Sequence, residues 1–222
     1  WLEARHSFSF ASWYQPDRLH FGALRVLNDD IIQGGMGFGT HPHDNMEIVT
    51  IPLKGDLEHK DSMGNAAVIQ EGDIQVMSAG TGVQHSEYNN NPDQDINLFQ
   101  LWLFPNKRNV TPRYDQLPIR SLYQKNAFFQ ILSPSADDQG VWIHQDAWMH
   151  MLDADPRQSF DYDLQSLDHG VYIIVIEGEV EVGDQTLSRR DAIGVWETQK
   201  VKIKTKSNSE LLLVQVPMIQ LA

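Results

Sequence analysis

Residues 40–48 read Thr-His-Pro-His-Asp-Asn-Met-Glu-Ile, and residues 79–89 read Ala-Gly-Thr-Gly-Val-Gln-His-Ser-Glu-Tyr-Asn. The first stretch contains a His-x-His pair and the second a His-x-Glu pair. Side chains two positions apart on a β-strand point to the same face of the sheet. If these two strands lie side by side in a β-barrel, three imidazoles and one carboxylate converge on one point.

The two pairs predict a metal site. Neutral imidazoles with one hard carboxylate and no thiolate suit Fe(II), Ni(II), Cu(II), Mn(II), Co(II) or Zn(II). Four protein ligands on an octahedral ion leave positions open for a substrate and dioxygen. Glu47 is a rival for the carboxylate, because it has the same parity along the chain as His43. The predicted ligands are His41, His43, His85 and Glu87.

The rest of the chain predicts an all-β fold. Helical periodicity is scarce, and short β-rich runs recur between Gly, Asn, Asp and Pro residues at the spacing of a barrel or a sandwich. The clearest runs are Glu47–Ile51, Ile74–Met77, Ile96–Phe104, Tyr172–Ile176 and Glu210–Val216.

An internal repeat indicates two similar barrels. Lys-Gly-Asp-Leu-Glu at 54–58 and Glu-Gly-Glu-Val-Glu at 177–181 each follow an apolar run, 123 residues apart. Each copy leads into an Asp-containing turn, at 71–74 and 190–193, that opens another strand. Two copies of one β-unit predict two domains, which we place at residues 1–119 and 120–222.

Composition excludes several classes of function. The 222 residues contain 17 Lys and Arg against 30 Asp and Glu, a formal net charge of -13, which disfavours nucleic acid as a partner. The absence of cysteine excludes disulfides, thiolate zinc sites, iron–sulfur clusters and cysteine nucleophiles, and it fits a cytoplasmic protein. The longest apolar runs are much shorter than the roughly 20 residues of a membrane helix.

Several residues near the two pairs have less specific roles. The glycine-rich stretch 34–39 lacks the helix and the Lys-Ser/Thr of a phosphate-binding loop, so its glycines are better explained by a close backbone approach to the metal pocket. Residues that either line an apolar pocket or pack in the core are Phe38, Met36, Met46 and Met77. Histidines without a partner at ligand spacing, expected to be structural or exposed, are His6, His20, His59, His144, His150 and His169.

These motifs resemble the cupin superfamily, and within it the pirin family. Typical phrases are THPHDNMEI, DSMGN, GDIQVMSAGTGVQHSEYN and the NLFQLW strand that follows. The resemblance implies two double-stranded β-helix (jelly-roll) cupin barrels in tandem, with a metal ion, Fe(II) foremost, in the first barrel only. It assigns the four ligands to His41, His43, His85 and Glu87 and leaves Glu47 outside.

The repeat also predicts that the second barrel lacks the ligands. Shifting the first pair by 123 residues, and aligning Asp73 with Asp191 for the second pair, leads to positions without imidazole or carboxylate. These positions hold Leu164, Ser166, Ile203 and Thr205.

The resemblance implies a flavonol (quercetin-type) dioxygenase that opens the flavonol ring with dioxygen and releases carbon monoxide. Glu87 is then both a ligand and the catalytic base, because it lies within reach of the substrate hydroxyl. One alternative is an iron-dependent, redox-sensing regulatory protein that acts through a protein partner. Another is an enzyme of a different kind that cleaves quercetin as a side activity.

Overall fold

The computed structural model describes residues 1–219, which form two compact units. The first comprises Trp1–His20, Leu24–Ser121 and Val141–Gln145, and the second comprises Phe21–Ala23, Leu122–Gly140 and the residues from Asp146 on. No helix within the described part of the chain is long and apolar enough to span a membrane. The predicted boundary between independent domains at residues 119 and 120 stays a prediction.

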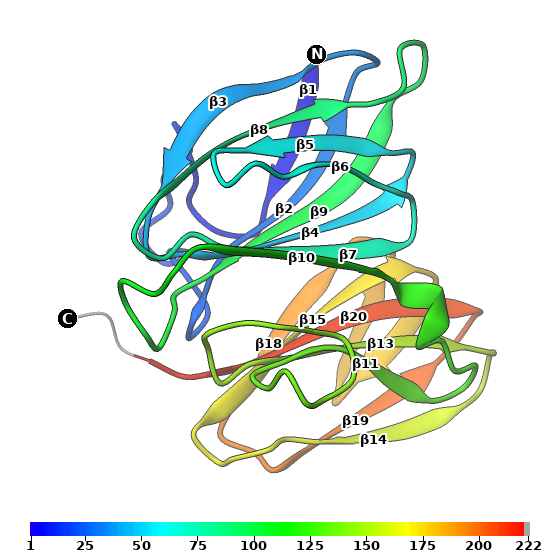
Figure 1. Cartoon of the computed structure of the whole chain (residues 1–222). Coiled ribbons are helices and arrows are strands. Elements are labelled where there is room, and N and C mark those ends of the chain that lie inside the picture. The colour runs from blue at the N-terminus through cyan, green and yellow to red at the C-terminus, as the bar shows by residue number, and fades with distance from the viewer. Residues whose placement is uncertain (220–222) are drawn as a thin grey trace. The chain divides into compact units, whose positions relative to one another are not determined.

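The first unit consists of two antiparallel sheets (Figure 1). One sheet has the strand order β1-β2-β9-β4-β7-β10 and the other β3-β8-β5-β6. The strands, with a short 3-10 helix η1 and the segment β12, are β1 Leu2–His6, β2 Leu24–Ile32, β3 Gly37–His43, β4 Glu47–Lys54, β5 Leu57–Asp61, β6 Ala66–Ile69, β7 Asp73–Ser78, β8 Val83–Asn89, β9 Ile96–Leu103, β10 Arg113–Pro118, η1 Ile119–Ser121 and β12 Val141–Trp142.

The second unit repeats this plan. One of its sheets contains the order β11-β13-β20-β15-β18, and the other has the order β14-β19-β16-β17. Its strands are β11 Phe128–Ser133, β13 Trp148–Ala154, β14 Ser159–Asp163, β15 His169–Glu177, β16 Glu179–Val182, β17 Gln185–Ser188, β18 Ala192–Val195, β19 Lys200–Thr205 and β20 Ser209–Pro217.

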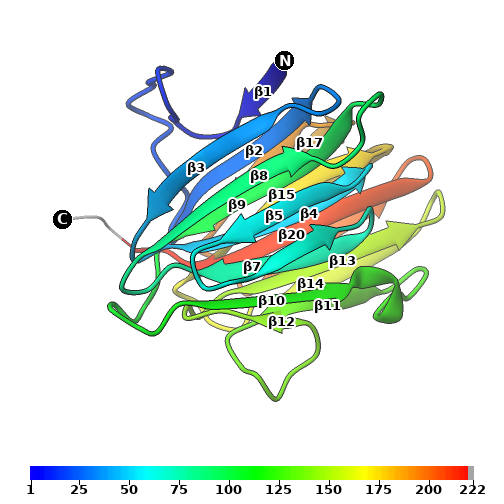
Figure 2. The same cartoon turned by 45° about the horizontal axis from the view of Figure 1, so that its top comes forward.

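The two units share one topology. The order β3-β8-β5-β6 in the first corresponds to β14-β19-β16-β17 in the second, and β2-β9-β4-β7 corresponds to β13-β20-β15-β18. Strands β3, β8 and β5 of the first four-stranded sheet lie side by side in both views (Figure 2). All five runs that the sequence predicts as strands are strands, so the all-β class and the two-barrel arrangement are confirmed.

The internal repeat has a structural basis in two turns. Gly55 and Gly178 follow equivalent strands and have φ angles of 77° and 91°, in the left-handed region that glycine adopts without strain. In the second turn a carboxylate accepts a backbone hydrogen bond from the residue three positions earlier. Asp73 Oδ2 accepts from Gln70 N at 3.0 Å, and Asp191 Oδ2 accepts from Ser188 N at 2.9 Å.

We expect Gly72→Ala to lower the free energy of unfolding of the first unit by about 1 kcal/mol, because an L-residue is strained at a positive φ. Gly72 has a φ of 79°, and an added Cβ meets nothing within 4 Å, so crowding contributes nothing. Gly72→Asn is the matched control and should lose less, since Asn tolerates this conformation better. Urea unfolding measures both variants, and equal losses would contradict the explanation from backbone conformation.

Candidate metal centre

A β-bulge in β3 sets which of its side chains face the interior of the first unit. Phe38 pairs with Glu87 and His41 pairs with His85, so between these pairs two residues of β3 oppose one of β8. In a regular strand Phe38 and His41 would point to opposite faces, because side chains alternate. The extra residue brings them to the same face as Glu87 and His85.

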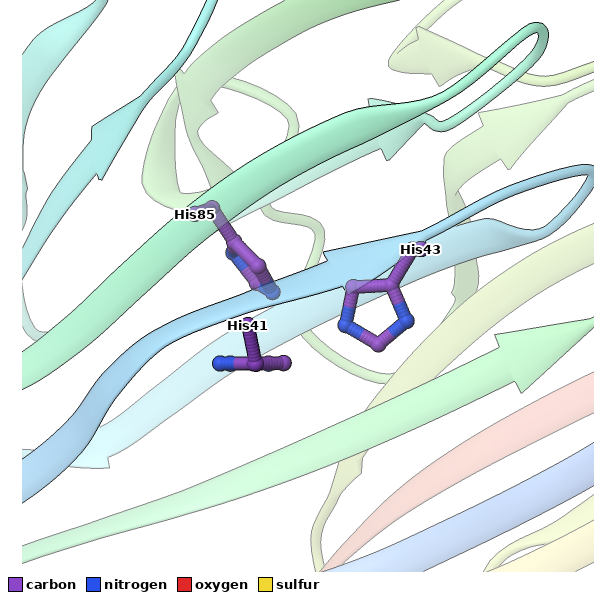
Figure 3. A group of neighbouring side chains, drawn as sticks. All are labelled: His41, His43 and His85. Carbon is purple, nitrogen blue, oxygen red and sulfur yellow. The ribbon is translucent and has the colours of Figure 1, made fainter.

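The three histidines of the predicted site converge on one another (Figure 3). The ring centroids of His41 and His85 are 4.4 Å apart, and those of His43 lie 4.9 Å from each of the other two. One nitrogen from each ring lies within 4.8 Å of the others, which is the spacing of a group able to hold one metal ion. His41 and His43 come from β3, and His85 comes from β8.

The protein environment favours the neutral form of two of these imidazoles, those of His43 and His85. Burial, reinforced by His85 and His41, lowers the pKa of His43 to about 4. Burial, reinforced by His41 and His59, lowers the pKa of His85 to about 3. His41 Nδ1 donates a hydrogen bond to Gly39 O at 2.8 Å, which orients the ring and makes Nε2 the nitrogen available to a metal ion. Neutral imidazoles at neutral pH are ready to act as ligands.

Glu87 is held by neutral donors from the facing sheet. Its Oε2 accepts a hydrogen bond from Gln100 Nε2 at 2.8 Å, and its Oε1 accepts one from Thr50 Oγ1 at 3.4 Å. Trp102 Nε1 donates to Gln100 Oε1 at 3.3 Å, which orients the amide toward the carboxylate. The Trp102 ring also packs against His43, with centroids 4.9 Å apart. Trp102 therefore packs against one candidate ligand, His43, and orients the amide that binds another, Glu87.

The structure places Glu87 in a second, overlapping group. Potential ligand atoms of Glu87, His85 and His59 lie within 4.8 Å of one another. Glu87 does not belong to the group formed by His41 and His43, and His85 is common to both. Within residues 1–219 these are the two groups of three such side chains.

His59, which the sequence predicts to be structural or exposed, belongs to this second group. It is fully buried on β5, directly opposite Glu87, and its ring centroid lies 5.3 Å from that of His85. Its Nε2 donates to Asp61 Oδ2 at 3.1 Å. Although burial acts to raise the pKa of Asp61, hydrogen bonds from Asn65 and His59 bring it below its ordinary value. The signal that could have found His59 is the His-x-Asp pair just before the turn.

Glu47, the rival carboxylate, lies elsewhere. The chain turns between β3 and β4, so Glu47 and His43 lie on different strands. Their even spacing along the chain therefore does not place their side chains on the same face. Glu47 is 1% exposed on β4 and accepts a hydrogen bond from Ser78 Oγ at 2.6 Å. Burial raises its pKa to about 7, although Ser78, the His144 backbone and Arg113 act in the opposite direction. Glu47 belongs to neither metal-capable group of the described residues.

A cavity of about 420 Å³ opens onto His41 and Glu87. Phe38 lines it, whereas Met36 is exposed, and Met46 and Met77 pack in a separate hydrophobic cluster. Its remaining lining residues are Trp1, Leu2, Ala4, His6, Phe10, Asn28, Asp30, Gly37, Gly39, Gln100 and Trp102.

Gly37 shows why glycine is needed beside this cavity. A Cβ at this position would overlap the backbone oxygen of Glu87 on the neighbouring strand. The close approach of β3 to β8 therefore requires glycine at position 37, as the sequence analysis expected for the glycine-rich stretch.

The residues present fit a cation. Both ring nitrogens of His85 and Nδ1 of His59 are buried and have no hydrogen-bond partner. Buried polar atoms without partners are costly, so each such atom needs an explanation. A neutral imidazole carries one N–H and one lone pair, so a divalent ion among these rings and the carboxylate would take the lone pair of a ring, and its preferred ligands are of this type.

The second unit replaces this whole set with a hydrophobic core. The β5–β8 and β16–β19 pairings match Glu87 with Ile203, and the β3–β8 and β14–β19 pairings match His41 with Tyr162. This register shifts the sequence-based mapping by two residues, so Ser166 and Thr205 are not the equivalents. Residues at the positions of His41, His43, Thr50, His59, His85, Glu87 and Gln100 are Tyr162, Leu164, Ile173, Val182, Val201, Ile203 and Leu213, and all lie in or against one hydrophobic cluster.

Two tandem barrels, the first with a cluster of imidazoles on its inner face, define a cupin with a metal-binding first barrel. A family model described as Pirin matches residues 1–103, and one described as Quercetinase C-terminal cupin domain matches residues 130–216. A relative from Escherichia coli strain K12, named quercetin 2,3-dioxygenase, is 40% identical and covers 98% of this chain and 92% of its own length. This chain belongs to the pirin family.

Solved structures agree with this assignment. The crystal structure of YhhW from Escherichia coli matches with a TM-score of 0.93 at 38% identity, over 100% of this chain and 93% of that one. The bacterial pirin YhhW in complex with nickel(II) matches with a TM-score of 0.92, over 99% and 93%. The predicted tandem cupin fold is confirmed, and so is the predicted class of quercetin dioxygenase-type oxidoreductase at the level of the family. A divalent-metal site is supported by the nickel complex of this relative.

Removing the charge of Glu47 should flatten the pH dependence of stability. The carboxyl is neutral in the fold up to a pKa of about 7, against 4.5 as its ordinary value, so folding favours its protonated form. Its contribution is therefore greatest below pH 4.5 and falls by up to about 3 kcal/mol as the pH rises to 7. Glu47→Gln keeps an acceptor for Ser78 and should remove this fall.

Chemical unfolding of the wild type and of Glu47→Gln at pH 5, 6, 7 and 8 measures the difference. Parallel curves for the two proteins across this range would refute a titrating Glu47.

Proposed function

We propose that this chain is a metal-dependent flavonol dioxygenase of the quercetin type. Its metal is held by His41, His43, His85 and Glu87. The observation that carries the proposal is the cavity of about 420 Å³, which meets the candidate ligands His41 and Glu87 at an aromatic-lined surface. Pockets for drug-sized ligands are roughly 300–1,000 Å³ and mostly apolar, with a few polar groups. A flat flavonol matches this size and lining.

The same cavity favours an enzyme over a redox-sensing regulator. A sensor needs only a small closed site whose surface changes with the oxidation state of the metal. Here the cavity walls are built from Trp1, Phe10, Phe38 and Trp102, which offer a surface for a planar ring. The relatives named quercetin 2,3-dioxygenase support the same substrate class.

We propose Fe(II) as the metal, with Ni, Cu, Mn, Co and Zn as alternatives. When bound, an ion of this set would supply a Lewis-acidic centre for the flavonol hydroxyl, and every one of them except Zn(II) would also supply redox activity toward dioxygen. The imidazoles of His43 and His85 hold it without first losing protons, because burial keeps the pKa values of these two rings low. The overall reaction opens the central ring of the flavonol and releases carbon monoxide.

Glu87 has two roles in this proposal. It lines the cavity, so its carboxylate is placed to accept the proton of the flavonol hydroxyl. Gln100 and Thr50 hold the carboxylate by hydrogen bonds and carry no charge, so they fix its position without neutralising it.

The first test is anaerobic purification with metal analysis, followed by quercetin turnover. We expect metal-dependent loss of flavonol absorbance with oxygen uptake and carbon monoxide release. His43→Ala should lose metal and at least a hundredfold in turnover, whereas His20→Ala, outside both metal-capable groups, should keep both. Glu87→Gln should lose turnover more than metal. A fully metallated wild type without turnover would sink the proposal.

Gln100→Leu tests the support of the carboxylate. Removing the amide leaves Glu87 Oε2 without its donor, and groups behind metal ligands typically contribute 10–100-fold to affinity. We expect the dissociation constant for Fe(II) or Ni(II) to rise about tenfold or more by competition with a chelator. Gln130→Leu is the matched control in the second unit and should leave affinity unchanged. Equal affinities in both variants would show that Gln100 does not position Glu87.

A further inference from the structure

The cavity contains polar groups that the metal centre does not use. Asn28 and Asp30 extend into it from β2, and His6 does so from β1. Asn28 Oδ1 lies 2.9 Å from His6 Nδ1, so these two atoms form a hydrogen bond with each other. The Asp30 carboxyl is different, because its Oδ1 is buried and has no hydrogen-bond partner.

The surroundings of Asp30 make this atom costly. The residue is 4% exposed, and its neighbours across the sheet are Ala4 on β1 and Leu98 on β9, neither of which offers a side-chain donor. A buried acceptor that lacks a partner costs free energy, about 1–3 kcal/mol in typical proteins. Asp30 belongs to neither metal-capable group, so a metal ion at that cluster is not expected to bind Oδ1. A donor supplied by a ligand in the cavity would remove this cost.

The lining indicates what kind of ligand supplies the donor. Phe38 and Trp1 meet edge to face with centroids 5.3 Å apart, and Phe10 and Trp102 do so at the same distance. These two aromatic pairs enclose a space suited to a planar ring system. A phenolic hydroxyl on such a ring donates one hydrogen bond, which is what Oδ1 lacks.

We propose that Asp30 is a specificity-determining residue that accepts a hydrogen bond from a ring hydroxyl of the flavonol other than the hydroxyl that reacts. The assignment rests on the proposed function and deepens it. Asp30 and Glu87 line the same cavity, so one flavonol molecule reaches both carboxyl groups. A site built to bind a hydroxyl rejects an analogue that lacks it, because the buried group is then left unpaired. The enzyme therefore selects polyhydroxylated flavonols.

The test measures flavonol binding to the metal-loaded protein without oxygen. Quenching of tryptophan fluorescence is the signal that monitors binding. Quercetin is compared with 3-hydroxyflavone, which keeps the reacting hydroxyl and the ring system but lacks the other hydroxyls. Asp30→Leu should weaken quercetin binding about tenfold or more, and 3-hydroxyflavone binding by less than about threefold. Asp30→Asn keeps an acceptor oxygen and should retain most of the preference, and Asp115→Asn, which lies outside the cavity lining, should retain all of it. Metal content is measured for every variant and should not change.

Three results overturn the assignment. Equal weakening of both flavonols by Asp30→Leu would mean that Asp30 acts through the metal centre or the fold, and no weakening of either would mean that it contacts no ligand. If Asp30→Leu does not fold, Asp30→Ala decides in its place by the same comparison. A metal-loaded wild type that binds neither flavonol would overturn the proposed function and this assignment together. If the wild type binds both quercetin and 3-hydroxyflavone, the test of Asp30 is independent of the test of the proposed function.

Discussion

The constraint on which the first unit depends is the burial of a polar layer inside an apolar β-barrel. On β9 the polar Gln100 lies between Leu98 and Trp102, each of which packs in or against a hydrophobic cluster. Glu87 receives hydrogen bonds from Thr50 and Gln100, whereas the imidazole of His85 receives none. Hydrogen bonds inside the protein therefore satisfy only part of this layer, and the remainder consists of lone pairs suited to a cation.

This constraint explains why much of the sequence pattern near the site is fixed by chemistry rather than by packing. The turn after β5 is built around Asp61, which accepts hydrogen bonds from the backbone of Met63 and Asn65 and from the ring of His59. The carboxylate thus shapes the turn and orients an imidazole at the same time. The Trp102 ring similarly covers His43 while its Nε1 orients Gln100. Side chains that appear structural in the sequence are in contact with the candidate metal centre.

The sequence predicted the fold better than the outline of the site. The alternation of apolar residues and the repeat with Gly55 and Gly178 are local signals, and both correspond to strands and turns of the structure. The convergence of His41, His43 and His85 followed from the same alternation. His59 could not be found in this way, because its approach to His85 depends on the pairing of β5 with β8. The bulge in β3 that turns Phe38 inward likewise has no sequence signal of its own.

The mapping between the barrels failed by two residues for a related reason. An ungapped shift ignores that loops of different length join equivalent strands, so it selected Ser166 and Thr205 in place of Leu164 and Ile203. The hydrogen-bonded registers are more reliable guides, because cross-strand neighbours keep their pairing when loops change. An irregularity between Pro52 and Lys54 even recurs between Val175 and Glu177.

The aliphatic layer of the second unit has a consequence for how the protein responds to metal supply. Ile173, Ile203 and Leu213 are fully buried in one hydrophobic cluster, and their apolar side chains need no bound ligand. With the proposed metal bound only in the first unit, a ligand that binds the folded state stabilises that unit by RT ln(1 + [L]/Kd) and gives the other no such gain. Scarcity of the ion would then lower the stability of the first unit, and the packing of this aliphatic layer would not depend on it.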